Sequence, residues 1–265
     1  MAPYDFDALD ADAILRSPDG KELRVHRIIL SLTSPVFQGM FSLPQSVRES
    51  SQIPIVDVPE SSDILEPFLQ CLYPRSPPKI SDLTMWTALY TTADKYGAEV
   101  VMDFLRDLLI SRFLETSPLR VYALASHWGL EEEARIASTK TLAIDVSKDL
   151  PQEDAELMGG AACRRLYLLH LNRRAAARAL VTDHPLPSPN GPFCKCPPLN
   201  DSGFITALCE RVATRPWLTS EDVNKEVVEW HFPGSCGWDC RHSIRNMHVY
   251  FASLLEKISD LPRTI

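Results

Sequence analysis

The sequence contains no apolar run long enough to cross a bilayer. Its longest stretch without a charged residue, residues 28–47, mixes apolar residues with Ser, Thr, Gln, Gly and two prolines, which are costly in a membrane span. The first residues have neither the basic region nor the apolar segment of a secretory signal. We therefore expect a soluble intracellular protein, cytoplasmic or nuclear, without a membrane partner.

The local motifs of common catalytic and nucleotide-binding sites are also missing. The sequence has no Gly-x-Ser-x-Gly elbow, no phosphate-cradling Gly-rich loop, no Gly-x-Gly-x-x-Gly and no His-Glu-x-x-His. A catalytic site would have to be assembled in space from residues that no local pattern marks. We expect a protein that is not an enzyme, and an enzyme of unknown type is the alternative that the sequence leaves open.

Positive charge is in the minority. The 265 residues include 27 Lys and Arg against 35 Asp and Glu, which gives a formal net charge of −8. Acidic residues gather at positions 5, 7, 10 and 12 and again at residues 131–133. This balance repels polyanions, so nucleic acid is not an expected partner.

The chain does have the material for a core. With 45% hydrophobic residues over 265 positions, it is long enough for one large or two modest domains. Its most informative stretch begins with two short β-type segments, Ala13–Arg16 and Lys21–Val25. Between them lies Ser-Pro-Asp-Gly, in which Pro presets φ and Gly closes the turn without steric conflict. This pattern predicts a tight β-hairpin.

Two short helices are predicted after the hairpin. The apolar residues between Ile28 and Leu32 fit the first helix. Ser34 followed by Pro35 is typical of the N-cap and first position of the second. Further on, an apolar stripe predicts a longer helix that starts after residue 81 and stops at Gly97.

Prolines limit the elements between these helices. Pro54 removes a backbone donor from the stretch 53–58, which makes that stretch an edge strand. Ser61, Ser62 and Asp63 can cap the helix that follows. We expect Pro67 to lie in the first turn of that helix, because later in the helix it would remove a backbone hydrogen bond.

The sequence of residues 12–41 resembles the N-terminal part of a BTB/POZ domain. The resemblance is carried by Asp12-Ala-Ile-Leu, the Pro-Asp-Gly turn, Val25-His-Arg-Ile-Ile-Leu-Ser and Thr33-Ser-Pro-Val-Phe-Gln-Gly-Met-Phe. It continues through Phe68-Leu-Gln-Cys-Leu-Tyr to about residue 113, less than half of the chain, and is strongest for fungal BTB proteins of unassigned role. It implies an α+β BTB/POZ fold, a small mixed sheet covered by helical hairpins, followed here by a mainly α-helical region.

The resemblance also implies self-association, as a homodimer or a higher assembly. In the family an Asp and a basic residue after a His meet in a charged pocket at the dimer interface, and Asp12 and Arg27 match these two positions. Family dimers also dock an N-terminal segment on the partner subunit, a role that Phe6 and Leu9 could take. From residue types alone, Asp12 could merely begin a strand and Arg27 could be a solvated surface charge.

A second partner is implied for the loop after Phe41. BTB proteins that serve as substrate adaptors for cullin-type ubiquitin ligases often carry a hydrophobic-x-Glu element there, and Val47-Arg48-Glu49 has these residue types. A polar loop without a partner is the alternative. As an adaptor, the protein would bind a cullin scaffold and an unknown protein client. The alternative function is a BTB scaffold or transcriptional co-regulator without a ligase connection.

Composition, periodicity and the resemblance to the BTB/POZ family together divide the chain into five expected parts. They are a flexible acidic lead-in over residues 1–11, the BTB/POZ domain over 12–115, a helical extension over 116–182, a Pro-rich linker or loop over 183–199 and a C-terminal helical region over 200–265. The extension should be interrupted at Gly159 and Gly160. The last helix carries an apolar stripe from Ile244 to Ile258, which should fold back onto the middle helices.

Seven cysteines are present without a small-domain disulfide pattern. No metal or other cofactor is expected, and the alternative is a structural zinc ion held by two close cysteine pairs with histidines nearby. The residues concerned are Cys194, Cys196, Cys236, Cys240, His231 and His242. Their spacing differs from that of a standard zinc finger.

Five arginines between residues 164 and 178 make one helix strongly basic. The simpler interpretation is a solvated face, and the alternative is a site for an acidic peptide.

Overall fold

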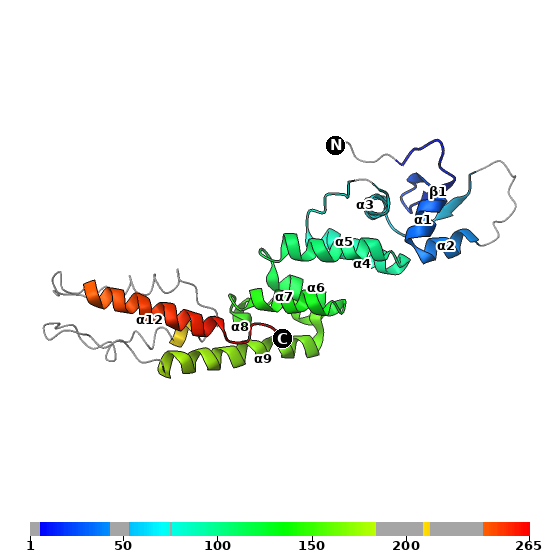
Figure 1. Ribbon diagram of the computed structural model, residues 1–265. Coiled ribbons are helices and arrows are strands. Elements are labelled where there is room, and N and C mark those ends of the chain that lie inside the picture. The colour runs from blue at the N-terminus through cyan, green and yellow to red at the C-terminus, as the bar shows by residue number, and fades with distance from the viewer. Residues whose placement is uncertain (1–5, 43–52, 75, 184–208, 213–240) are drawn as a thin grey trace. The chain divides into compact units, whose positions relative to one another are not determined.

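The structure is a computed structural model that describes residues 6–42, 53–74, 76–183, 209–212 and 241–265 (Figure 1). The chain divides into two compact units, Met1–Phe113 and Leu114–Ile265.

The N-terminal unit combines a small sheet with short helices. Its elements are, in chain order, β1 (Ala13–Arg16), β2 (Glu22–Val25), α1 (Arg27–Thr33), α2 (Pro35–Ser42), β3 (Ile55–Asp57), α3 (Ser62–Leu72), α4 (Leu83–Tyr96), α5 (Glu99–Leu108) and the π-helical turn η1 (Leu109–Phe113). The strand order is β2-β1-β3, with β1 antiparallel to β2 and parallel to β3. The expected α+β fold with a small mixed sheet is confirmed, as are the hairpin and the edge position of β3.

An aspartate in the hairpin turn caps a helix that lies far along the chain. Asp19, in the hairpin turn, accepts hydrogen bonds from the backbone N–H of Ser62 at 3.1 Å and from its hydroxyl at 2.6 Å. These bonds hold the pKa of the Asp19 carboxyl well below its usual range. The expectation that Ser61 would cap α3 was wrong in this respect, because the Ser61 side chain makes no capping bond. The cap comes instead from the turn, which fixes α3 against the sheet.

The position expected for Pro67 was also wrong. It lies inside α3, beyond the first turn, where its missing N–H leaves one helical hydrogen bond unmade. The helix persists because its other face is held in the core by Leu65, Phe68 and Leu69, all of which are fully buried. Tertiary packing outweighs the local cost of the proline.

Stacked aromatic rings form the centre of the N-terminal unit. The Tyr96 ring stacks on Phe37 with a centroid distance of 4.5 Å and on Phe68 at 5.5 Å, which joins α4, α2 and α3. The buried Trp86 donates its indole N–H to the carbonyl of Leu105 at 2.7 Å, which joins α4 to α5. These contacts give the short helices one common core.

Gly97 ends α4 in a conformation that only glycine adopts without strain. Its φ is +62°, and an added Cβ would lie 3.0 Å from the Pro35 side chain. We expect Gly97→Ala to lower the free energy of unfolding by about 1–2 kcal/mol, measured by urea denaturation. Gly39→Ala is the matched control, since no atom lies within 4 Å of its Cβ position and alanine favours the α2 helix. Equal destabilisation by both substitutions would contradict the explanation.

Helices are the only regular secondary structure among the described residues of the C-terminal unit. Its elements are α6 (Pro118–His127), α7 (Glu131–Thr141), α8 (Val146–Asp149), α9 (Gln152–Asp183) and α12 (Arg241–Ser259). Helix α6 packs against α7 and α9, and the Tyr122 hydroxyl donates to the carbonyl of Ala162 at 3.0 Å across the α6–α9 contact. Helix α9 is kinked at Gly159, where φ is 75° and ψ is 163°, as the glycine pair predicted.

The last helix folds back onto α9, as its apolar stripe predicted. Tyr250, Leu254 and Ile258 of α12 are buried in one cluster with Ala177 and Val181 of α9. The sequence cannot say which middle helix receives the stripe, and the structure identifies α9. The Pro-rich segment after Asp183 lies outside the described residues.

Arg173 of α9 is buried and fastens the end of α12. Its guanidinium donates to the carbonyls of Ile258, Leu261 and Pro262 at 2.7, 2.6 and 2.8 Å. Burial lowers the pKa of Arg173 to about 10, helped by the nearby Arg263 charge, so the group stays charged at neutral pH. The interpretation of the basic helix as a solvated face was therefore wrong for Arg173, because its charge-assisted hydrogen bonds to three carbonyls at the end of α12 replace its hydration.

His170 and Arg174 lie one helical turn apart on α9. Arg174 donates to the buried carboxylate of Asp145 at 3.1 Å. His170 contacts Thr141, with 3.1 Å between His170 Nε2 and Thr141 Oγ1, while the Thr141 hydroxyl donates to the carbonyl of Ser138 at 2.7 Å. Since that proton is already used, Nε2 must be the protonated nitrogen of the neutral His170 ring. This network ties α9 to α7 and to the segment before α8.

Candidate interaction surface

The start of α1 is held by Asp12, the residue just before β1. Its carboxylate Oδ1 accepts a hydrogen bond from the backbone N–H of Arg27 at 2.7 Å. The residue at the N-cap position, His26, makes no capping bond with its own side chain. Asp12 therefore supplies the missing acceptor and places a negative charge at the helix N-terminus, where it is stabilising.

The Arg27 side chain points away from that carboxylate. Its guanidinium donates to the carbonyl of Phe41 at 2.6 Å and lies over the Phe41 ring, 5.2 Å from the centroid. The structure thus brings Asp12 and Arg27 together, but through the Arg27 backbone, and it uses the Arg27 side chain to cap the end of α2. The two residues fix the orientation of α1 and α2 with respect to the sheet.

Helices α1 and α2 leave apolar side chains in solvent. Within α1 only Leu30 is buried, whereas Ile28 is 65% exposed and Leu32, one turn later, is 78% exposed. Val36 of α2 is 40% exposed and Leu9 of the N-terminal segment 92%. We call Leu9, Ile28, Leu32 and Val36 the α1 surface. Large apolar side chains grouped on adjoining elements are typical of protein contact sites.

The segment before β1 is packed on its own unit. The Phe6 ring is buried and meets the Tyr73 ring edge to face at a centroid distance of 5.5 Å, and the Phe6 carbonyl accepts from Arg24 N–H at 2.8 Å. His26 adds a contact of 3.4 Å from its Nε2 to Asp10 Oδ1. Phe6 is therefore used inside the unit, and Leu9 is left exposed between these two anchors.

The sequence predicted the two helices of this surface but not which of their apolar side chains are exposed. It places Ile28, Leu30 and Leu32 together as one apolar run, and a run that is apolar on all sides does not tell which face is buried. The signal in the sequence that could have revealed the exposed side is that α1 has more large apolar residues than the core can take up. A seven-residue helix that buries only Leu30 carries three further large apolar residues, Ile28, Ile29 and Leu32.

The remaining candidate residues are not placed by the structure. Val47 and Glu49 lie outside the described residues, as do Cys194, Cys196, Cys236 and Cys240. Within the described part of the chain, no group of three or more His, Cys, Asp or Glu residues could hold a metal ion. Burial raises the pKa of the Cys71 thiol to about 12, which keeps it protonated and unreactive.

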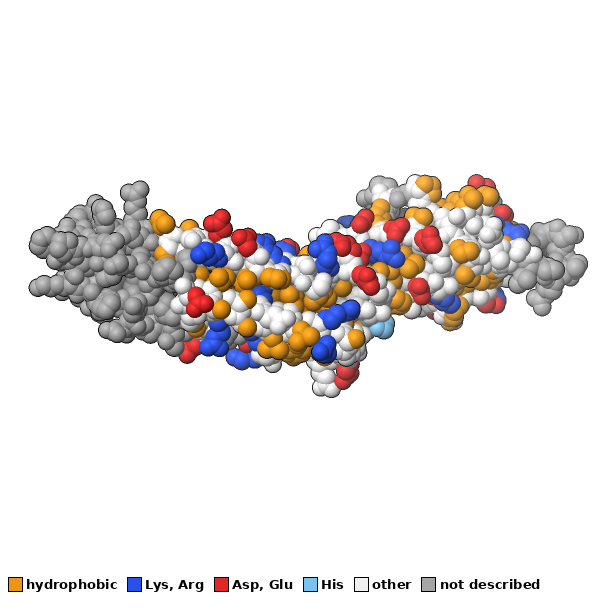
Figure 2. All heavy atoms as spheres, turned by 60° about the horizontal axis from the view of Figure 1, so that its bottom comes forward, with side chains coloured by type: hydrophobic (Ala, Val, Ile, Leu, Met, Phe, Trp, Pro, Cys, Tyr) orange, Lys and Arg blue, Asp and Glu red, His pale blue; other side chains and the backbone are white. Residues whose placement is uncertain are grey.

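Charges of both signs share the visible surface. Figure 2 shows Lys and Arg side chains interspersed with Asp and Glu on the face that it draws, with hydrophobic side chains between them. Neither positive nor negative charge predominates on that face. Among the helices that the structure describes, none combines the length and the apolar character needed to cross a membrane.

Comparison with known families identifies the N-terminal unit. The family model of the BTB/POZ domain matches residues 7–112. Residues 7–112 form a BTB/POZ domain. The BTB/POZ domain is a protein–protein interaction module, which agrees with the exposed apolar residues of α1.

Two curated proteins are similar to part of this chain. The chain is 31% identical over 90 residues to TD and POZ domain-containing protein 5 of Mus musculus and 30% identical over 90 residues to TD and POZ domain-containing protein 4 of the same organism. The aligned residues make up 34% of this chain and 26% and 24% of those proteins. The chain therefore matches about a quarter of the length of these relatives.

Proposed function

We propose that this chain is an intracellular interaction protein whose BTB/POZ domain associates with a second copy of itself through the α1 surface. The supporting observation is the exposure of Ile28 and Leu32, at 65% and 78%, on a helix whose first residue is bonded to Asp12 and to the Phe41 carbonyl. Burial of one such side chain stabilises an interface by roughly 1.5–3 kcal/mol. In a two-fold symmetric contact, Ile28 and Leu32 of both subunits are buried.

Asp12 and Arg27 belong to this proposal as the residues that place the surface. They lie at the N-terminal end of α1, where Arg27 is the neighbour of Ile28 in the chain. Their bonds to Arg27 N–H and to the Phe41 carbonyl fix α1 before association. Little ordering cost then remains to be met when two copies meet.

The double substitution Ile28→Glu, Leu32→Glu tests self-association. We expect the unmodified chain to sediment as a dimer or larger species and the variant as a monomer, with the dissociation constant raised at least about tenfold. Val100→Glu is the matched control, because Val100 is 62% exposed on α5 of the same unit but outside the α1 surface. An unmodified chain that sediments as a monomer at every concentration would refute the proposal.

We further propose that the segment between α2 and β3, which contains Val47 and Glu49, docks a cullin scaffold, so that the protein acts as a substrate adaptor for a cullin-type ubiquitin ligase. The support is the Val47-Arg48-Glu49 pattern and its place in a BTB/POZ domain. The C-terminal unit would then hold a protein client.

Pulldown with a purified cullin separates this role from the alternative of a scaffold or co-regulator without a ligase connection. The intact chain should retain the cullin, and the variant Val47→Ala, Glu49→Ala should lose it, while Ser46→Ala in the same segment should not. A chain that sediments as a dimer and retains no cullin would favour the alternative.

A further inference from the structure

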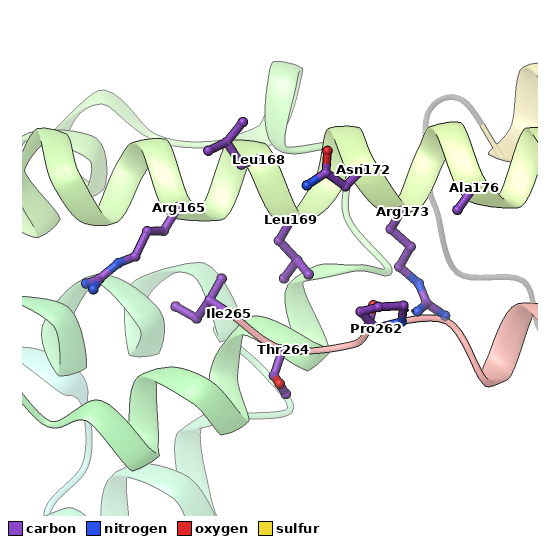
Figure 3. A pocket seen from close by; sticks show the side chains of 9 residues that line it. All are labelled: Arg165, Leu168, Leu169, Asn172, Arg173, Ala176, Pro262, Thr264 and Ile265. Atoms are coloured by element: carbon purple, nitrogen blue, oxygen red, sulfur yellow. Dashed lines mark hydrogen bonds between the residues drawn. The ribbon is translucent and has the colours of Figure 1, made fainter.

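A half-open groove of about 440 Å³ lies in the C-terminal unit between α9 and the segment after α12. Figure 3 shows α9 forming one wall and Pro262, Thr264 and Ile265 forming the other. Apolar side chains make up most of the lining, among them Leu168 and Leu169 of α9. The volume falls within the range of roughly 300–1,000 Å³ that is usual for small-molecule sites.

The wall opposite α9 is fixed by Arg173. Although Arg173 lines the groove, its guanidinium is already bonded to the carbonyls of Ile258, Leu261 and Pro262. It therefore holds the segment in place and is not the group that a ligand would meet. A wall held by three hydrogen bonds from a buried cation keeps the groove open before any ligand arrives.

Arg165 brings the charge that a ligand would meet. It lines the same part of the groove as Ile265 (Figure 3), and no ion pair to it occurs within the described residues. The guanidinium is also close to Tyr122 of α6: burial raises the pKa of that phenol, and the Arg165 charge opposes the rise. Arg165 is thus an exposed cation at one end of an apolar groove.

We propose that this groove binds a small amphipathic acid, a slender hydrocarbon chain that ends in a carboxylate. The hydrocarbon lies along Leu168, Leu169 and Ala176, and the carboxylate is bound by Arg165. A guanidinium at the end of an apolar channel favours an anionic end group, because the pair forms charge-assisted hydrogen bonds. This site is independent of the α1 surface and does not require self-association.

Calorimetric titration of the full chain with octanoic, decanoic and dodecanoic acid, each beside the alcohol of equal length, tests the proposal. Affinity should rise up to about fourfold for each added methylene until the groove is filled. Each acid should bind about tenfold more tightly than its alcohol, because a hydrogen bond to a charged group is lost in the alcohol.

Three variants assign the binding to the groove. Arg165→Gln should reduce the affinity for each acid to that for its alcohol and leave the alcohols unchanged. Arg164→Gln, the neighbouring exposed arginine that does not line the groove, should behave as the unmodified chain. Ala176→Phe should fill the groove and weaken acids and alcohols alike, with unchanged thermal unfolding as proof of folding.

Several outcomes overturn the proposal. They are the absence of acid binding, equal affinity for acids and alcohols, and equal loss in the two arginine variants. Acid binding that disappears as the protein concentration rises would identify a second copy of the chain as the occupant and would overturn it as well.

Discussion

Replacing Arg173 with Met is expected to lower the free energy of unfolding of the C-terminal unit by about 3–5 kcal/mol. Methionine keeps the apolar stem but removes every donor, so the carbonyls of Leu261 and Pro262 lose the Arg173 hydrogen bonds and the Ile258 carbonyl keeps only its bond from the Leu261 N–H. Leaving a buried acceptor without a hydrogen bond costs about 1–3 kcal/mol, and the substitution removes the Arg173 bond from two such acceptors, the carbonyls of Leu261 and Pro262. The measurement is urea denaturation of the full chain.

The same substitution should release α12 from α9 before the rest of the unit unfolds. Hydrogen exchange in residues 250–258 should therefore quicken more than exchange in α6 or α7. Arg173→Lys retains the charge but only a point-like donor group, and its loss should be intermediate. Arg164→Met removes an exposed arginine of the same helix and should change stability by less than about 0.5 kcal/mol. Equal losses for Arg164→Met and Arg173→Met would refute the structural role of Arg173.

The elements that the sequence predicts well are those with local causes. The hairpin follows from Pro18, Asp19 and Gly20, which set a turn between two β-type segments. The start of α2 follows from Ser34 and Pro35, and the Ser34 hydroxyl indeed accepts from Phe37 N–H at 3.1 Å. The kink at Gly159 is local for the same reason. In each case the residues that decide the conformation are neighbours in the chain.

The long-range caps could not be predicted in this way. Asp12 reaches a backbone group 15 residues away, and Asp19 reaches one 43 residues away. No pattern in the sequence announces either contact, and Ser61 offered a closer but unused cap for α3. The contacts exist only because the sheet brings the strand ends to the helix starts.

The candidate surface was predicted in part for a related reason. The family resemblance pointed to the region of Asp12 and Arg27, and the structure places both at the start of α1. Periodicity could not decide that Leu30 faces the core while Ile28 and Leu32 face solvent. The same uncertainty affected Arg173, whose charge indicated a surface position although its hydrogen bonds keep it buried.

Acidification is expected to destabilise the C-terminal unit through His170. Burial lowers the pKa of His170 from 6.5 to about 4, and the positive charges of Arg174 and Arg173 add to this effect while Asp145 opposes it. Protonation would place a charge on a ring whose Nδ1 has no hydrogen-bond partner within the described residues. The folded state therefore binds this proton less readily than the unfolded state does.

The sign of the pH dependence follows from this difference. Well above pH 6.5 the ring is neutral in both states, and stability is at its full value. As the pH falls toward 4, the unfolded state gains the proton first, and the unit should lose about 3 kcal/mol in total, about 2 of it by pH 5. Urea denaturation at pH 7.5 and pH 5 measures the loss at pH values where ordinary carboxyl groups are still ionised.

The variant His170→Leu should remove most of this acid sensitivity. Leucine fills a similar volume and cannot be protonated, and the Thr141 hydroxyl keeps its bond to the Ser138 carbonyl. His127→Gln, at an exposed histidine on α6, should leave the pH dependence as it is. A His170→Leu chain that still loses about 2 kcal/mol between pH 7.5 and pH 5 would show that another group carries the proton linkage.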